Sequence, residues 1–222
     1  MKREWIKSIS MVVAAAVAGA FSAGIASAQQ APPPSQSSST AQSSGAVPPP
    51  GTIGDRKENQ QDRIANGVKD GQLTAGETAN LENKEAGLNR EVRTDRAANG
   101  GSLTGAEKTQ INQQQNKLSK NIYADKHNAA TAKPGNSEVG QRQQNQQGRI
   151  AQGIKSGQLT AGETSRLESR EAGLNKEVRT DRQANGGKLT SGEKTQVNKQ
   201  QNKLSNKIYQ DKHNNRTQHP KK

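Results

Sequence analysis

Large apolar residues recur along this chain at helical spacing. Neighbouring members of each set lie four or seven positions apart, so each set forms one stripe of a helix, and Gln, Asn, Lys and Glu cover the other faces. In the first half of the chain the stripes consist of Ile64, Val68, Leu81, Leu88, Val92, Ile111, Leu118 and Ile122. No stretch alternates long enough for a strand. The pattern therefore predicts an all-α fold.

The second half of the chain repeats the first. Residues 59–128 align without gaps on residues 145–214, at an offset of 86, with about three quarters of the positions identical. Within each copy a Gly-x-Leu-Thr-x-x-Glu motif occurs twice; the four motifs end at Glu77, Glu107, Glu163 and Glu193. Thr-x-x-Glu is the capping box that begins a helix, and the preceding Gly suits the left-handed residue that ends one. We predict a helix–turn–helix corner at each motif.

These signals divide the chain into two tandem three-helix units. The expected helices are 57–69, 75–98, 105–129, 142–155, 161–185 and 191–215. Unit 1 spans 55–134 and unit 2 spans 141–216; a linker at 135–140 joins them and a basic tail follows at 217–222. Leu73 and Leu103, at the corners, are expected to plug the ends of the bundle.

The N-terminal region predicts export. Residues 1–28 have a positive start, an apolar run too short to span a membrane comfortably, and small residues at Ala26 and Ala28, which is typical of a signal peptide cleaved before Gln29. Residues 29–54 are rich in Pro, Ser and Gln and predict a disordered tether. We expect the processed protein to be periplasmic or secreted, with no membrane span after signal cleavage.

Composition limits the core. Of the 222 residues 27% are hydrophobic and 2% aromatic, there is no Cys, and mean hydropathy is −1.09. Few large apolar side chains must stabilise each unit, so docking of the two units or self-association is expected to add buried surface. Gly87 and Gly173 interrupt helices; they either allow close helix approach or are tolerated weak spots.

A calcium loop is the sharpest candidate site. Residues 66–77 resemble the EF-hand loop, with Gly at the sixth position, an aliphatic residue at the eighth and Glu at the twelfth. The resemblance implies Ca2+ ligands at Asn66, Asp70 and Glu77, but Val68 occupies another ligand position. The other three corners depart further from the pattern. No other cofactor is expected.

Histidines offer a weaker metal hypothesis. His127 and His213 occupy matching places near helix ends, where positive charge also suits the helix dipole. A neighbouring Asp two residues away points to a different face, so zinc, nickel or copper would require a subunit interface.

The formal charge of +13 favours an anionic partner. Lys/Arg minus Asp/Glu is +1 over 59–128 and +6 over 145–214, so the excess lies in the second copy. We predict contact with anionic envelope polymers or lipids through Lys199, Lys203, Lys207, Lys212, Lys221 and Lys222. Stacking aromatics and nucleic-acid motifs are missing, so specific nucleic-acid binding is not expected.

No catalytic motif is present, and we expect no enzyme activity. The runs GQLTxGE, NREVRTDR, GGxLTxxEK and IYxDKHN resemble those of a type of exported bacterial tandem-repeat protein, a resemblance that covers nearly all of both units and implies no activity. The sequence thus favours a non-catalytic envelope scaffold, adaptor or self-associating module whose partner is a protein, an envelope polymer or a second copy of the chain. The alternatives are a calcium-binding or a polyanion-binding module.

Overall fold

A computed structural model of the chain describes residues 51–218. The predicted signal peptide, nearly all of the predicted tether and the last part of the basic tail lie outside these residues. The described part consists of α1 (Ile53–Lys69), α2 (Ala75–Ala98), α3 (Gly105–Lys126), α4 (Glu138–Lys155), α5 (Ala161–Ala184) and α6 (Ser191–Lys212). It contains no strand, which confirms the all-α prediction.

The four predicted corners form as the motifs indicate. Each of α2, α3, α5 and α6 begins with a capping box in which the Thr hydroxyl accepts from the Glu backbone N–H and the Glu carboxylate accepts from the Thr backbone N–H. The glycine three residues before each Thr has a positive φ: Gly71, Gly101, Gly157 and Gly187. An L side chain would be strained there, which explains why glycine recurs at this place.

Several helix ends differ from the sequence-based bounds. α1 begins at Ile53, inside the predicted tether, because Thr52 and Asp55 form a fifth capping box. α4 begins at Glu138, inside the predicted linker, because the side chain of Ser137 caps its first turn. α3 and α6 end three residues before the predicted position, where a histidine caps the last turn. Short polar residues beside the Pro- and Gly-rich stretches thus act as helix starts.

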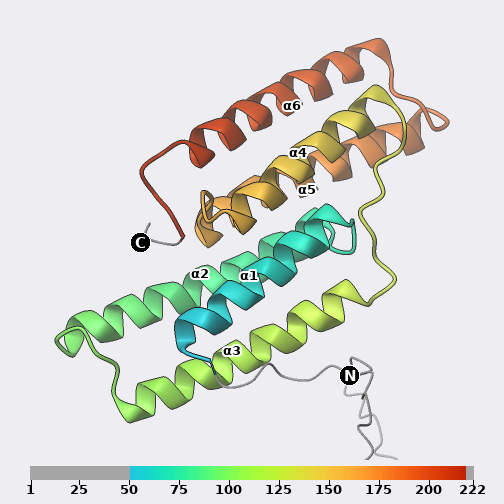
Figure 1. Ribbon diagram of the computed structural model, residues 1–222. Coiled ribbons are helices and arrows are strands. Elements are labelled where there is room, and N and C mark those ends of the chain that lie inside the picture. Colours follow the sequence, from blue (N-terminus) through green and yellow to red (C-terminus); the bar gives the residue numbers. More distant parts are fainter. Residues whose placement is uncertain (1–50, 219–222) are drawn as a thin grey trace, which may run out of the picture. The chain divides into compact units, whose positions relative to one another are not determined.

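Four helices form an inner layer flanked by the other two. α2 packs along α5 and α1 along α4, while α3 packs on α1 and α2, and α6 on α4 and α5. Within the described residues α3 and α6 do not contact each other, and they lie on opposite sides of the inner helices (Figure 1).

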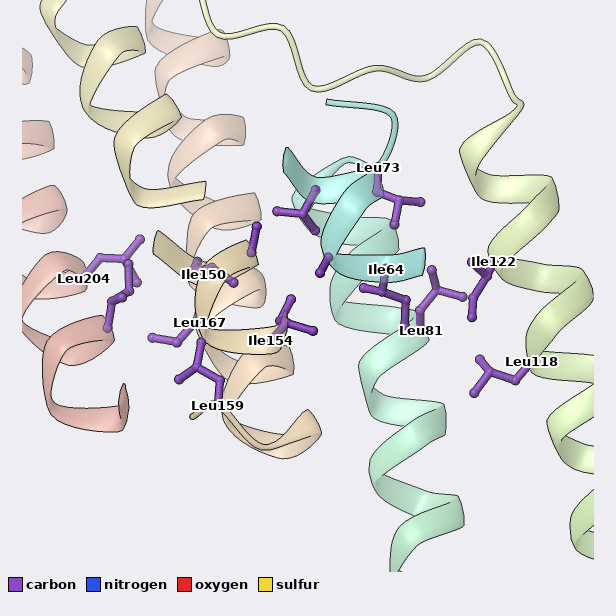
Figure 2. Close-up of a cluster of buried hydrophobic side chains, with 14 residues drawn as sticks. Ile64, Leu73, Leu81, Leu118, Ile122, Ile150, Ile154, Leu159, Leu167 and Leu204 are labelled. Carbon is purple, nitrogen blue, oxygen red and sulfur yellow. The ribbon is translucent and has the colours of Figure 1, made fainter. Parts of the chain in front are cut away.

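The main hydrophobic core is shared by all six helices. Figure 2 shows its side chains converging from both halves of the described chain. The cluster comprises Ile64, Ala65, Val68, Leu73, Leu81, Leu118, Ile122, Ile150, Ala151, Ile154, Leu159, Leu167, Leu204 and Ile208. The two copies therefore dock on each other through α1, α2, α4 and α5, and this docking supplies burial that neither copy has alone.

Buried glutamines extend this thin core. Gln60 Nε2 donates to the Gln115 carbonyl oxygen at 2.7 Å, and Gln115 Nε2 donates to the Ile53 carbonyl oxygen at 2.9 Å. Gln146 and Gln201 repeat both kinds of bond between α4 and α6. Each glutamine ties a flanking helix to an inner one without requiring another large apolar side chain.

Tight packing of a leucine side chain occurs at glycines other than those singled out from the sequence. A Cβ at Gly67 would lie 2.7 Å from Leu73 Cδ1, and one at Gly153 would lie 2.6 Å from Leu159 Cδ1. A Cβ at Gly87 or Gly173 would meet nothing within 4 Å. The latter two glycines are therefore not contact points between helices.

Candidate functional site

The three predicted calcium ligands lie at the first corner, but their side chains are not hydrogen-bonded to one another. Asn66 and Asp70 are exposed, and no hydrogen bond in this corner links either of them to Glu77. Glu77 Oε2 accepts from Thr74 N at 2.9 Å, and Glu77 Oε1 accepts from Asn128 Nδ2 at 2.6 Å. Burial, which alone would raise the pKa of Glu77, is outweighed by these hydrogen bonds, and the pKa is lowered. Both carboxylate oxygens thus stabilise the corner.

No metal centre is assembled elsewhere in residues 51–218. Groups of three or more His, Asp or Glu side chains arranged to hold a metal ion are absent from this part of the chain. Calcium binding therefore stays a prediction that only a titration can test.

The lysines of the predicted polyanion surface differ in their surroundings. The surface comprises Lys199, Lys203, Lys207, Lys212, Lys221 and Lys222. The first two are exposed one turn apart on α6, and the last two lie outside the described residues. Lys207 Nζ lies 2.7 Å from Asp211 Oδ1, and Lys212 Nζ donates to Gln152 Oε1 at 3.1 Å. Two of the four described lysines are thus engaged within the protein.

Each flanking helix carries an exposed aromatic pair near its end. Tyr123 stacks on His127 and Tyr209 stacks on His213, each with ring centroids 4.1 Å apart. In both pairs the His Nδ1 lies 2.7 Å from the Tyr carbonyl oxygen. A carbonyl oxygen only accepts, so Nδ1 carries the hydrogen and the ring orientation is fixed. With 52% and 60% exposure, the tyrosines are the exposed large hydrophobic residues of the described chain.

Four carboxyl groups lie buried in the inner layer. Glu82 and Glu85 of α2 and Glu168 and Glu171 of α5 have 0% exposed surface. The sequence-based interpretation, which placed the glutamates of these helices on solvated faces, is wrong for these four. Glu82 Oε2 accepts from a Gln61 amide at 3.2 Å, and Glu168 accepts in the same way from the second copy's glutamine. The core is therefore partly polar.

Burial shifts these groups toward their neutral form. It raises the pKa of Glu168 to about 8 and the pKa of Glu171 to about 7. The pKa of Glu82 is raised well above its usual value by burial and by repulsion from the Glu85 and Glu168 carboxylates. Burial raises the pKa of Glu85 to about 7 against the attraction of the Lys57 ammonium group. A carboxyl that loses its hydration favours the protonated state.

Lys57 and Gln218 occupy the end of the inner layer that holds Glu85, which we call the filled end. The half-buried Lys57 Nζ donates to the Gln218 carbonyl oxygen at 3.3 Å. Gln218 Oε1 accepts from the backbone N–H of Ala161, at the start of α5, at 3.1 Å. Burial lowers the pKa of Lys57, and attraction by Glu85 opposes this shift. A cation thus lies near this carboxylate and is hydrogen-bonded to a glutamine that also accepts from the first residue of α5.

The equivalent place in the other copy, which we call the open end, lacks both groups. At the offset of 86 residues, Gln143 stands for Lys57, Ala132 stands for Gln218 and Glu171 corresponds to Glu85. A cavity of about 780 Å³ opens here. Its lining comprises Thr74, Ala75, Gly76, residues 131–135, Gln143, Gln147, Glu171, Ala172, Asn175, Lys176, Val178, Arg179, Arg182, Gln183 and Gly187.

Sequence reasoning missed this site, although a signal was available. Glu85 lies four residues after Leu81 and three before Leu88, which puts it on the apolar stripe of α2. Glu171 repeats the position in α5. A charge on a stripe that must face the core, repeated in both copies, indicates a buried carboxyl.

Comparisons of the chain with protein-family models, with curated proteins and with solved structures found no match. Among the helices of residues 51–218, none combines the length and apolar character needed to cross a membrane. The functional inference accordingly depends on the chain's own geometry.

Proposed function

We propose that this protein is an exported, non-catalytic scaffold that holds two copies of one partner, one on α3 and one on α6. The observation that carries the proposal is the repeated Tyr–His pair. Tyr123 and Tyr209 are exposed, occupy equivalent positions and belong to α3 and α6. These two helices flank the inner layer (Figure 1). Two equal surfaces held apart by a shared core can engage two equal partners.

The chemistry of the pair supports a role in binding. Tyrosine is enriched where proteins bind one another, because it offers a large contact area and a polar tip at little cost in side-chain entropy. Stacking on a histidine fixed by a 2.7 Å hydrogen bond lowers that entropic cost further. Export rests on the signal-peptide pattern of residues 1–28, and the non-catalytic role rests on the lack of catalytic motifs in the sequence.

Site-specific photocrosslinking in cells that produce the full chain tests the proposal. A photoreactive amino acid replaces Tyr123 in one variant and Tyr209 in another. Thr94 and Thr180, exposed equivalent positions on α2 and α5, serve as matched controls. We expect both tyrosine positions to give an adduct of the same mass and the control positions to give none. An adduct with a second copy of this chain would identify self-association as the partner interaction.

Different partners at the two tyrosine positions, or adducts of equal yield at the controls, would contradict the proposal. Calcium calorimetry on the same protein tests the alternative at Asn66, Asp70 and Glu77. Heat accompanied by a gain of helix would favour the calcium-binding module over the scaffold. Retention on heparin that depends on Lys199 and Lys203 would favour the polyanion alternative.

A further inference from the structure

The open end has the size and position of a small-molecule site. Its cavity of about 780 Å³ lies between the start of α2, residues 131–135, α4 and α5. This volume falls within the usual range of ligand pockets. Side chains from both copies line it, so it exists only because the copies dock.

Several buried polar atoms of its lining residues are hydrogen-bond acceptors without donors. Both carboxylate oxygens of Glu171, Asn175 Oδ1 and Gln147 Oε1 are buried and have no hydrogen-bond partner, and all three residues line the cavity. Glu171 itself has 0% exposed surface. A buried acceptor without a donor is costly, and a group that satisfies several acceptors at once must carry several N–H or O–H bonds. A primary ammonium group carries three N–H bonds and the charge that a carboxylate needs.

The filled end places a cation near the equivalent carboxylate, although both oxygens of Glu85 also lack a hydrogen-bond partner. There Lys57 brings an ammonium toward Glu85 from the position that Gln143 occupies at the open end. Gln218 closes that end, whereas its equivalent at the open end is the smaller Ala132. The two exchanges remove one cation and one long side chain from the surroundings of Glu171. The open end thus lacks the nearby cation that the filled end has.

The other charged residues of the lining indicate which chemical group the far end of the ligand carries. Apart from Glu171, the charged residues that line the cavity are Lys133, Lys176, Arg179 and Arg182. Lys133, Lys176 and Arg179 are exposed and Arg182 is half-buried, so positive charge surrounds the cavity on the solvent side of the buried carboxylate. A simple diamine would meet this charge with a second cation. A carboxylate or phosphate at the far end of the ligand would pair with the guanidinium and ammonium groups.

We infer that the open end binds a small zwitterion whose primary ammonium group contacts Glu171 and whose anionic group contacts Arg179 and Arg182. Amino acids with a terminal amine on a flexible chain belong to this class. The inference does not depend on the scaffold proposal, because it concerns a different surface of the molecule.

Calorimetry with 6-aminohexanoate as the probe tests the inference on the protein purified from cells that produce the full chain. We expect one site per chain. Glu171→Gln should weaken binding by about 10- to 100-fold, the usual effect of losing a charge-assisted hydrogen bond. Gln143→Lys should weaken it comparably, because the new ammonium group would occupy the place of the ligand's own. Glu85→Gln, at the filled end, is the matched control and should leave the affinity unchanged.

Probes that carry half of the ligand separate the two contacts. Cadaverine offers ammonium groups without an anion, hexanoate offers the anion alone, and both should bind at least about tenfold more weakly than 6-aminohexanoate. Hexanoate binding as tightly as the full probe, with no effect of Glu171→Gln, would overturn the inference and assign the cavity to anions. Absence of binding by every probe would also overturn it and would indicate that water satisfies the acceptors. Helix content and thermal melting of each variant show that it is folded.

Discussion

The filled and open ends of the inner layer share a fold and differ in what occupies it. Both place a buried glutamate in the inner layer, Glu85 on α2 and Glu171 on α5. At the filled end Lys57 lies near the carboxylate and donates to Gln218, while at the open end Gln143 and Ala132 stand in their places and a cavity opens. The two copies thus share the scaffold, and two residue differences distinguish their ends.

The largest expected effect comes from the buried glutamates Glu82, Glu85, Glu168 and Glu171. We predict that the free energy of unfolding falls as pH rises from about 4.5 to about 8, by several kcal/mol in total. The folded-state pKa values are raised, so the folded protein keeps protons that the unfolded chain releases above about pH 4.5. This stability is fully present below the unfolded pKa and is lost as pH rises through the folded pKa. Urea unfolding at a series of pH values measures it.

Replacing Glu82, Glu85, Glu168 and Glu171 together with Gln provides the control for this prediction. The variant should show little change of stability over the same pH range, because it lacks the four carboxyl groups whose pKa values are raised. An equally steep decline in the variant would place the titrating groups elsewhere.

Exchanging the cation between the ends should give the next largest effect. At pH 8 we expect Gln143→Lys to raise the free energy of unfolding by about 1–2 kcal/mol, because Glu171 gains the kind of partner that Glu85 has. Lys57→Gln should lower it by a similar amount by leaving Glu85 without a cation. Both are measured by urea unfolding. If both variants lost stability equally, the two ends would not be electrostatically distinct.

The amide that closes the filled end should contribute less. Gln218→Ala removes the acceptor of the Ala161 backbone N–H, and the loss of such a helix-start contact costs about 1 kcal/mol. Ala132→Gln places the same side chain at the open end, where we expect no loss of stability because the cavity has room. Thermal melts of the two variants compare these outcomes. A destabilised Ala132→Gln protein would mean that the open end is already packed.

The smallest effect is expected where the copies do not differ. Gly87→Ala and Gly173→Ala should each stabilise the protein by about 0.5–1 kcal/mol, since Ala favours helix and a Cβ would meet nothing within 4 Å at either position. Chemical unfolding measures both. Unequal responses would show that the copies differ beyond their two ends.

The sequence predicted the elements of this fold better than their assembly. The corners follow from local chemistry, and the positive φ of Gly71 and the capping box of Thr74 and Glu77 are both as expected. The early start of α1 was missed because the capping box at Thr52 adjoins a stretch that otherwise predicts disorder. Docking of the copies depends on contacts far apart in the chain, such as Ser165 Oγ to the Ala79 carbonyl at 3.0 Å, which local periodicity does not encode.

The candidate site was missed for the same reason. Glu171 is polar, and only the packing of α5 against α2 makes it buried rather than solvated. The difference between Lys57 and Gln143 is visible in the alignment of the two copies. Only the structure shows that Lys57 lies near a buried carboxyl group. Corners were predictable because their bonds join near neighbours, whereas the cavity joins four separate segments.

Carbon-13 NMR titration of the Glu171 and Glu85 side-chain carboxyls tests the central claim most directly. Without a ligand, both groups should titrate near pH 7. With 6-aminohexanoate at saturation, the pKa of Glu171 should fall, because the bound ammonium group favours the carboxylate, and the pKa of Glu85 should stay where it is. A pKa near 4.5 for Glu171 would contradict the burial of this carboxyl, and equal responses of both glutamates to the probe would contradict the distinction between an open and a filled end.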